Sequence, residues 1–284
     1  MPFLRRPATL PLGLDIGAEI VSIVSTEACD DGFAVRETRS LEIPRVDPAQ
    51  LDLKVAETIG TIVRSLATNE RRCVLAAPSG ELVTRIFRVP PGMRRSEAHR
   101  AAALEAGTIV EWPLSERQVA LDPIPGTSDD MLLSIARRST IERLVAIARA
   151  GGLRPVAVDV PACAWRRAVP GVDAVLDCSS ERAELVIFGS PLGLTHVFPP
   201  RLVDERIASH VRALFADARR EGVADVQRIA ILASRFRYET IEALLRDDGY
   251  AIAPVAVDGN EAPAWTFAFG LASWAVAARG FVSA

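Results

Sequence analysis

The sequence predicts an α/β fold of two related half-domains, each a mixed sheet with helices, and a small α/β insert in the first half. An apolar hairpin at 12–24 carries one aspartate at the end of its first strand, and a weaker copy lies at 174–188. Each hairpin precedes a third strand, a helix and further strands, so one unit occurs twice. The stretch 90–154 has helices and short strands of its own and interrupts the first copy.

Length and composition indicate a soluble protein with a substantial core. The 284 residues are 49% hydrophobic and 24% charged, with a formal net charge of -3. That balance excludes a nucleic-acid binder that relies on neutralising phosphates, because such a protein needs a basic surplus. The apolar run 10–24 is too short for a membrane span and contains Asp15 and Glu19, and no signal peptide precedes it. We therefore expect a cytoplasmic protein with no direct membrane insertion.

The cysteines and histidines match no metal-binding pattern. Cys29, Cys73, Cys163 and Cys178 are widely spaced, and two of them lie inside apolar strands. Such cysteines are typical of buried thiols in a reducing compartment. The three histidines are isolated in the sequence, and their spacing predicts no metal site.

The two hairpins contain the residues with the strongest chemical signal. Asp15 interrupts an apolar strand, where a charge needs a metal, a phosphate network or a hydrogen-bond partner. Gly17 allows a tight turn and the close approach of a ligand. Asp177 has the equivalent position in the second hairpin, and Ser179 follows it. Either aspartate could bind a metal, or it could accept hydrogen bonds from the amides of its own turn.

The first half-domain is expected over 1–89 and the insert over 90–154. Strands are predicted at 33–43, 73–77 and 82–89, with a helix from Asp47-Pro48 to about Leu66. In the insert, Ser96 is a candidate cap for a helix that reaches about 110, and strands follow at 118–121 and 131–136. Ser139 and Glu142 match a capping box, which predicts a second helix that ends at Gly151-Gly152.

The second half-domain is expected over 174–284, after a crossover strand and helix at 155–173. Its hairpin precedes a strand at 192–198 and a helix at 204–220, and then strands at 228–233 and 250–257 alternate with helices at 238–246 and 265–279. The order of elements repeats that of the first half. Only a few residues separate the strand at 192–198 from the long helix.

Several short blocks occur in an order that is typical of one family. They are RVPPGM at 88–93, AALEA at 102–106 with WPL at 112–114, the helix 141–148, GGLRPVAVD at 151–159 and FGLA at 269–272. In this order they resemble the type IV pilus assembly protein PilM family, in the FtsA-like branch of the actin-like ATPase superfamily. The resemblance implies the actin-like ATPase (ribonuclease H-like) fold and covers most of the chain.

The resemblance also implies where a nucleotide site would lie. In the superfamily the first hairpin holds nucleotide phosphates and metal and the second hairpin holds the other side, which assigns Asp15, Gly17, Asp177 and Ser179 to the site. ATP and Mg²⁺ would be its cofactors if it were intact. In this sequence, 18–20 (Ala-Glu-Ile) replace the usual hydroxyl residues of the first loop, and Ser179 replaces a glycine.

Three further departures concern the rest of that site. The turn that binds adenosine should consist of small residues, but here it reads Ala233-Ser-Arg-Phe-Arg237, and Phe236 with two arginines would fill the pocket. The subdomain that usually closes over the nucleotide is missing from the second half. Val160, and not a carboxylate, precedes the helix-starting Pro161, while Asp159 should point to the other face of its strand. We therefore predict a pseudo-ATPase with a vestigial nucleotide site, no catalytic residue, no metal and no cofactor.

Three functions follow from the resemblance. The leading hypothesis is a non-catalytic adaptor at the inner face of the inner membrane, in a type IV pilus, competence or secretion apparatus. It would bind the short N-terminal tail of a PilN-like bitopic membrane protein, and it could form homo-oligomers. The alternatives are an ATP-dependent small-molecule kinase or ATPase of the same superfamily, and a relative of the cytoplasmic domain of the type II secretion protein GspL.

The partner surface is expected where the strand 82–89 enters the insert, because PilM-like proteins bind the tail between the insert and the first half-domain. Side chains alternate along this strand, so Arg85 and Phe87 share one face and Ile86 lies on the other. We predict Arg85, Ile86 and Phe87 as partner-binding residues. Phe87 is the preferred anchor, because a large aromatic side chain often dominates a peptide interface; the alternative is that Phe87 packs in the core.

Overall fold

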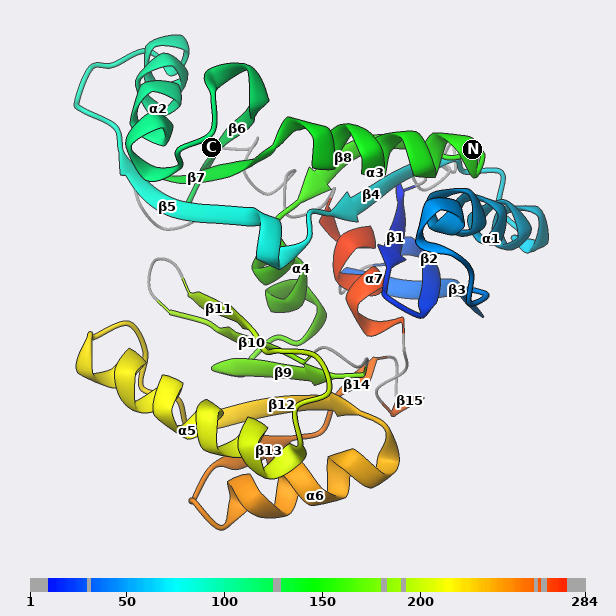
Figure 1. Ribbon diagram of the computed structural model, residues 1–284, viewed down its shortest axis with the longest axis vertical. Coiled ribbons are helices and arrows are strands. Elements are labelled where there is room, and N and C mark those ends of the chain that lie inside the picture. The colour runs from blue at the N-terminus through cyan, green and yellow to red at the C-terminus, as the bar shows by residue number, and fades with distance from the viewer. Residues whose placement is uncertain are drawn as a thin grey trace, which may run out of the picture.

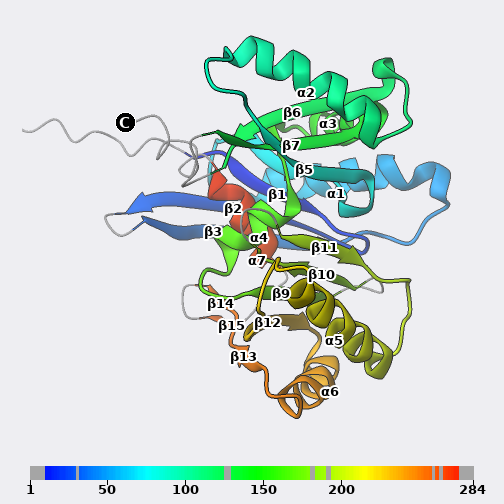
Figure 2. The ribbon, with the colours of Figure 1, turned by 90° about the vertical axis from the view of Figure 1, so that its left-hand side faces the viewer.

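The computed structural model describes residues 10–29, 32–124, 129–179, 183–189, 193–257, 260–261 and 265–274. Two sheets with flanking helices lie one above the other, and the insert projects from the upper one, at the upper left of Figure 1 (Figures 1 and 2). Each half-domain has its own cluster of buried apolar side chains, and the insert has a third.

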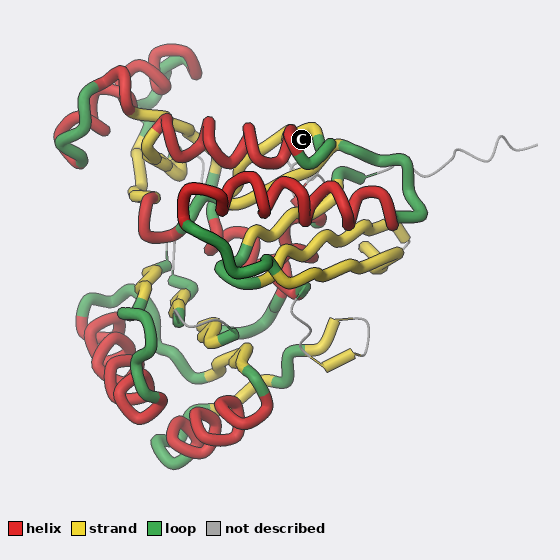
Figure 3. The backbone as a smooth tube through the Cα atoms, turned by 45° about the vertical axis from the view of Figure 1, so that its right-hand side comes forward, coloured by secondary structure: helices red, strands yellow, loops and turns green. Residues whose placement is uncertain are grey.

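The first half-domain is a five-stranded sheet with the order β3-β2-β1-β4-β8. Its strands are β1 Leu12–Ile16, β2 Ile20–Cys29, β3 Gly32–Glu42, β4 Arg72–Ala76 and β8 Arg154–Asp159. β1 pairs antiparallel with β2 and parallel with β4. Two helices, α1 (Leu51–Ser65) and α3 (Arg138–Ala150), lie side by side over one face, where their apolar sides pack on the strands (Figure 3).

The second half-domain repeats this plan with the strand order β11-β10-β9-β12-β13. Its elements are β9 Ala174–Cys178, β10 Glu184–Ile187, β11 Leu194–Val197, α5 Asp204–Arg220, β12 Arg228–Ala233, α6 Arg235–Arg246 and β13 Ala251–Ala253, followed by the small hairpin of β14 Ala256–Val257 and β15 Asn260–Glu261. In both halves the first three strands form an antiparallel meander, and the next two strands pair in parallel. The predicted duplication is therefore confirmed.

Two helices join the halves by crossing between them. α4 (Pro161–Ala168) follows the first sheet but packs its Trp165 against the second, whereas α7 (Thr266–Ala272) ends the described chain and packs on β1 and β2. Glycines permit the close contacts: a Cβ at Gly13 would lie 1.8 Å from the Ala268 carbonyl oxygen, and one at Gly270 would lie 2.1 Å from that of Ala164. A larger residue at Gly13 would push α7 away from β1, and one at Gly270 would push α7 away from α4.

The insert is a three-stranded sheet in the order β5-β7-β6 under one helix. Its elements are β5 Leu82–Arg88, α2 Arg95–Ile109, β6 Arg117–Pro123 and β7 Asp130–Arg137. The sequence placed β5 in the first half-domain and α3 in the insert. The structure instead pairs β5 with β7, while the apolar side of α3 packs with α1 in the core of the first half-domain.

The N-cap residues of two helices differ from those predicted from the sequence. α3 begins directly after β7, and Arg137 is its N-cap, so Ser139 lies inside the first turn and forms no capping box. Likewise Arg94, and not Ser96, caps α2. The connection from β11 to α5 consists of 198–203 alone, so no closing lobe lies at this point of the second half-domain, as the sequence predicted.

Candidate functional site

The two hairpins bring three carboxyl groups together at the junction of the half-domains. Asp15 is near the end of β1, and Asp177 is near the end of β9, as expected from the sequence. Glu184, the first residue of β10, lies directly opposite Asp177 in the strand pairing. Ser79, in a 3-10 turn before β5, donates a hydrogen bond of 2.6 Å from its Oγ to Glu184 Oε1. Sequence reasoning identified the two aspartates but missed Ser79 and Glu184.

The electrostatics of this junction favour protonated acids. Burial, with the nearby carboxylates of Asp177 and Glu184, raises the pKa of Asp15 to about 7. Burial and Asp177 also raise the pKa of Glu184 to about 7, against the opposing effect of the Ser79 hydrogen bond. Burial raises the pKa of Asp177 too. Where these acids ionise, their negative charge is unfavourable for the phosphates of a nucleotide unless a cation accompanies them.

The hairpin turns use polar groups that a phosphate ligand would need. The Gly17 amide donates to the Ile20 carbonyl oxygen at 2.9 Å, and a Cβ at Gly17 would lie 2.8 Å from that oxygen. Asp177 Oδ1 accepts a hydrogen bond of 2.9 Å from the Ser179 amide. Among the described residues, no group of three or more His, Cys, Asp or Glu side chains is arranged to hold a metal ion. The geometry thus fits the hydrogen-bonded alternative for Asp177.

Arg237 lies in the first turn of α6. This is the segment in which we predicted that bulky side chains fill the adenosine pocket. Its guanidinium donates from Nη1 to the Cys178 carbonyl oxygen at 2.8 Å and pairs with Asp204 of α5 at 2.9 Å. Arg237 therefore ties the starts of α5 and α6 to the end of β9. The side chains of Arg235 and Phe236, which the sequence placed in the same pocket, lie outside the described part of the chain.

Asp159 forms a structural ion pair. Its carboxylate pairs with Arg167 of α4 and accepts a hydrogen bond of 2.8 Å from the Val160 amide. Arg167 also donates to the Gly270 carbonyl oxygen of α7 at 2.9 Å. The group joins β8, α4 and α7, and it gives Asp159 a role in the contact between the crossing helices.

The predicted partner-binding residues lie on two faces of the insert sheet. Phe87 is only 6% exposed and packs in the insert core with Ala102 and Leu133, so its side chain is not available as a surface anchor. Arg85 is exposed at the edge of the same strand. Ile86 is 38% exposed and points to the opposite face, as the alternation of a strand requires.

We call this opposite face the inner face of the insert sheet; it consists of Thr84, Ile86, Ala120, Asp122, Leu132 and Ser134, which lie opposite one another in the strand pairing. The charge of Asp122 acts on Asp159 at the end of β8, so the inner face looks toward β8. On β8, Val156 is 45% exposed.

At the centre of the inner face the Oγ of Ser134 is buried and has no hydrogen-bond partner among the described residues. Exposed apolar side chains with polar neighbours, as at Ile86 and Val156, can accept a peptide.

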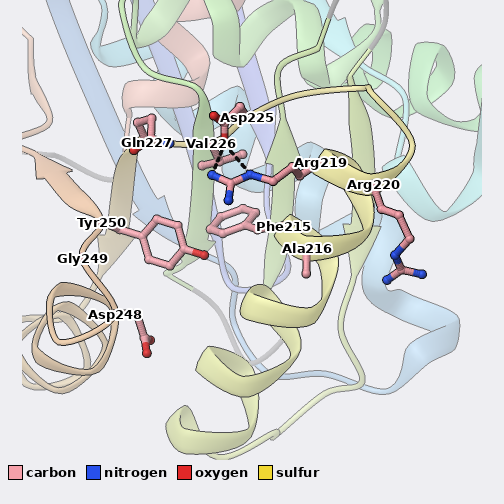
Figure 4. Close-up of a pocket in the computed structure, with 10 residues that line it drawn as sticks. All are labelled: Phe215, Ala216, Arg219, Arg220, Asp225, Val226, Gln227, Asp248, Gly249 and Tyr250. Carbon is pink, nitrogen blue, oxygen red and sulfur yellow. Dashed lines mark hydrogen bonds and ion pairs between the residues drawn. The ribbon is translucent and has the colours of Figure 1, made fainter.

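A separate hollow lies at the far end of α5. It has a volume of about 380 Å³ and is lined by Phe215, Arg219, Asp225, Asp248 and Tyr250, among others (Figure 4). Its charged groups are paired: Arg219 binds Asp225 with an Nε–Oδ1 distance of 2.7 Å, and Asp248 binds Arg212. The hollow lies beside Asp173, at the opposite end of β9 from Asp177, and we assign it no function.

None of the described helices is both long and apolar enough to cross a membrane.

The predicted burial of two cysteine side chains is confirmed for Cys73 and Cys178, and burial raises the pKa of each thiol to about 12. These thiols are therefore protonated and unreactive at neutral pH.

The sequence profile of the type IV pilus assembly protein PilM family matches residues 13–190. No curated protein sequence matches the chain at a significant level.

Solved structures resemble the chain over nearly its whole length. The PilM-PilN type IV pilus biogenesis complex contains a chain that is 19% identical, with a TM-score of 0.71, covering 95% of this chain and 99% of that one. The cytoplasmic domain of EpsL, an inner membrane component of the type II secretion system of Vibrio cholerae, is 8% identical with a TM-score of 0.55, covering 94% of each chain. The ethanolamine utilization protein EutJ from Carboxydothermus hydrogenoformans is 12% identical with a TM-score of 0.53, covering 94% of this chain and 90% of that one. These likenesses confirm the predicted actin-like ATPase fold.

Proposed function

Because this chain belongs to the type IV pilus assembly protein PilM family, we propose that it is a non-catalytic adaptor at the inner face of the inner membrane. In this role it binds the short N-terminal tail of a PilN-like bitopic membrane protein. The similar solved structure is a complex of PilM with PilN, which supports a partner of this kind. The membrane-spanning partner would recruit the adaptor to the pilus assembly platform.

The inner face of the insert sheet is the proposed binding surface for the tail. The observation that carries this assignment is the exposed side chain of Ile86 on this face, together with the exposed Val156 on β8. An extended peptide would bury Ile86 and Val156. β8 is the last strand of its sheet, so its free side offers main-chain groups for the same peptide.

The absence of catalysis is the second part of the proposal. Three acids with raised pKa values lie together where the family resemblance implies the phosphates, and the Arg237–Asp204 ion pair lies at the start of α6. Val160 supplies no base before α4, and Asp159 is bound to Arg167. These features favour an adaptor over a small-molecule kinase or ATPase.

The test is a titration of the chain into a fluorescently labelled peptide with the sequence of the partner's N-terminal tail. We expect saturable binding that Ile86→Glu weakens at least 30-fold, because the charge would be buried against an apolar peptide. Leu104→Glu is the matched control, since Leu104 is 78% exposed on α2 and lies on the other side of the insert sheet. Equal affinities of both variants and the parent chain would remove the tail from the inner face.

A further inference from the structure

The turn from Ser79 to Glu81, which we call the η2 turn, is where the three parts of the molecule meet. It follows β4 of the first half-domain and leads directly into β5, the strand that carries Ile86. Ser79 contacts the second half-domain through its hydrogen bond to Glu184. Glu81 accepts a hydrogen bond from Thr140 of α3, in the first half-domain. Strand β11 also lies against this turn.

The Ser79–Glu184 bond joins residues that are 105 positions apart in the chain. Glu184 lies directly opposite Asp177, so the bond is formed at the junction where other members of the fold would place a ligand between the halves. At this junction the Ser79 hydroxyl of the first part of the chain is hydrogen-bonded to Glu184 of the second half-domain. Any movement of β10 away from the first half-domain must break the bond or pull the η2 turn with it.

We propose that the Ser79–Glu184 hydrogen bond couples the closure of the two half-domains to tail binding at the insert. This inference rests on the proposed function, because it concerns the regulation of the same binding surface. The second half-domain holds the η2 turn, and the η2 turn sets the position of β5 and of Ile86. If the Ser79–Glu184 bond changes the affinity for the tail by some factor, then by linkage the bound tail must change the equilibrium constant of that bond by the same factor.

Hydrogen exchange of the chain without any peptide tests the coupling first. Ser79→Ala removes the donor, and we expect about tenfold faster exchange of amides both in β10 and in β5, from the loss of one buried hydrogen bond. Glu184→Gln keeps an acceptor oxygen and should retain the exchange pattern of the parent chain. Thr140→Val breaks only the Glu81 contact and should leave β10 unchanged. Unchanged exchange in β5 of Ser79→Ala would overturn the proposal.

Peptide binding provides the second arm. In the parent chain and in Glu184→Gln, the tail peptide should change the exchange of β10, whereas in Ser79→Ala it should not. A peptide effect on β10 that persists in Ser79→Ala would also overturn the coupling. A chain that binds no tail peptide but shows faster exchange in both β5 and β10 of Ser79→Ala would instead support the coupling and contradict the proposed function. The two failures are therefore distinguishable.

Discussion

The guanidinium of Arg237 donates a hydrogen bond to the carbonyl oxygen of Cys178 at 2.8 Å. The same group pairs with Asp204, so one side chain joins β9, α5 and α6. The family resemblance implies small residues at the start of α6 in members that bind nucleotide. In this chain Arg237 stabilises the second half-domain through these contacts.

Replacing Arg237 should therefore cost stability. In Arg237→Ala, Asp204 and the Cys178 carbonyl lose their partner in a partly buried site, and we expect the free energy of unfolding to fall by about 2 kcal/mol. Urea denaturation measures this change. Arg246→Ala is the matched control on the same helix, because its exposed pair with Glu242 is worth about 0.5 kcal/mol or less. A loss no larger in Arg237→Ala than in the control would contradict this role.

The ion pair between Asp159 and Arg167 should be more important than exposed pairs. Arg167→Ala leaves a buried carboxylate without its cation and removes the contact to Gly270, and we expect a loss of about 3 kcal/mol. In contrast, Arg143→Ala removes an exposed pair with Asp52 and should cost about 1 kcal/mol or less. Thermal unfolding followed by circular dichroism compares the two. Similar melting temperatures would show that the crossing helices do not depend on this pair.

The cluster of acids predicts how stability changes with pH. Folding raises the pKa of Asp15 and Glu184 to about 7 from ordinary values near 4, so the folded chain binds more protons between these limits. Their contribution is complete below pH 4 and decreases as pH rises toward 7. We expect Asp15→Asn to reduce this decrease when melting temperatures at pH 5 and pH 8 are compared with those of the parent chain. An identical pH dependence in both proteins would contradict the raised pKa.

The two neighbouring residues of β5 should behave differently. Phe87→Ala opens a cavity in the insert core and should lower the free energy of unfolding by about 3 to 5 kcal/mol. Ile86→Ala removes a half-exposed side chain on the inner face and should cost about 1 kcal/mol or less. Chemical denaturation distinguishes them. A fully stable Phe87→Ala variant would return Phe87 to the list of surface candidates.

Local pattern and duplication made much of the fold predictable. The helix 204–220 and the strand 228–233 lie where the sequence placed them, because apolar spacing and end residues agree there. The limits of the insert were not predictable in the same way. Periodicity shows that α3 has an apolar side, but only the fold reveals that this side packs on α1 and not on the insert sheet.

The candidate site was predictable only in part for a similar reason. An aspartate in an apolar strand is visible in the sequence, so Asp15 and Asp177 were identified. Glu184 and Ser79 have ordinary neighbours, and their contact depends on the approach of two elements far apart in the chain. For Phe87, the alternation of β5 gave two possible faces, and packing against α2 decided between them.

An adaptor of this kind binds its partner's tail and not a nucleotide. Isothermal titration of the chain with the tail peptide, alone and in excess Mg·ATP, distinguishes it from an ATPase. We expect saturable micromolar binding of the peptide, the same affinity with Mg·ATP present, no heat of ATP binding at micromolar nucleotide and intact peptide binding in Asp15→Ala. A saturable micromolar ATP isotherm that Asp15→Ala abolishes, with no binding of the tail, would contradict it.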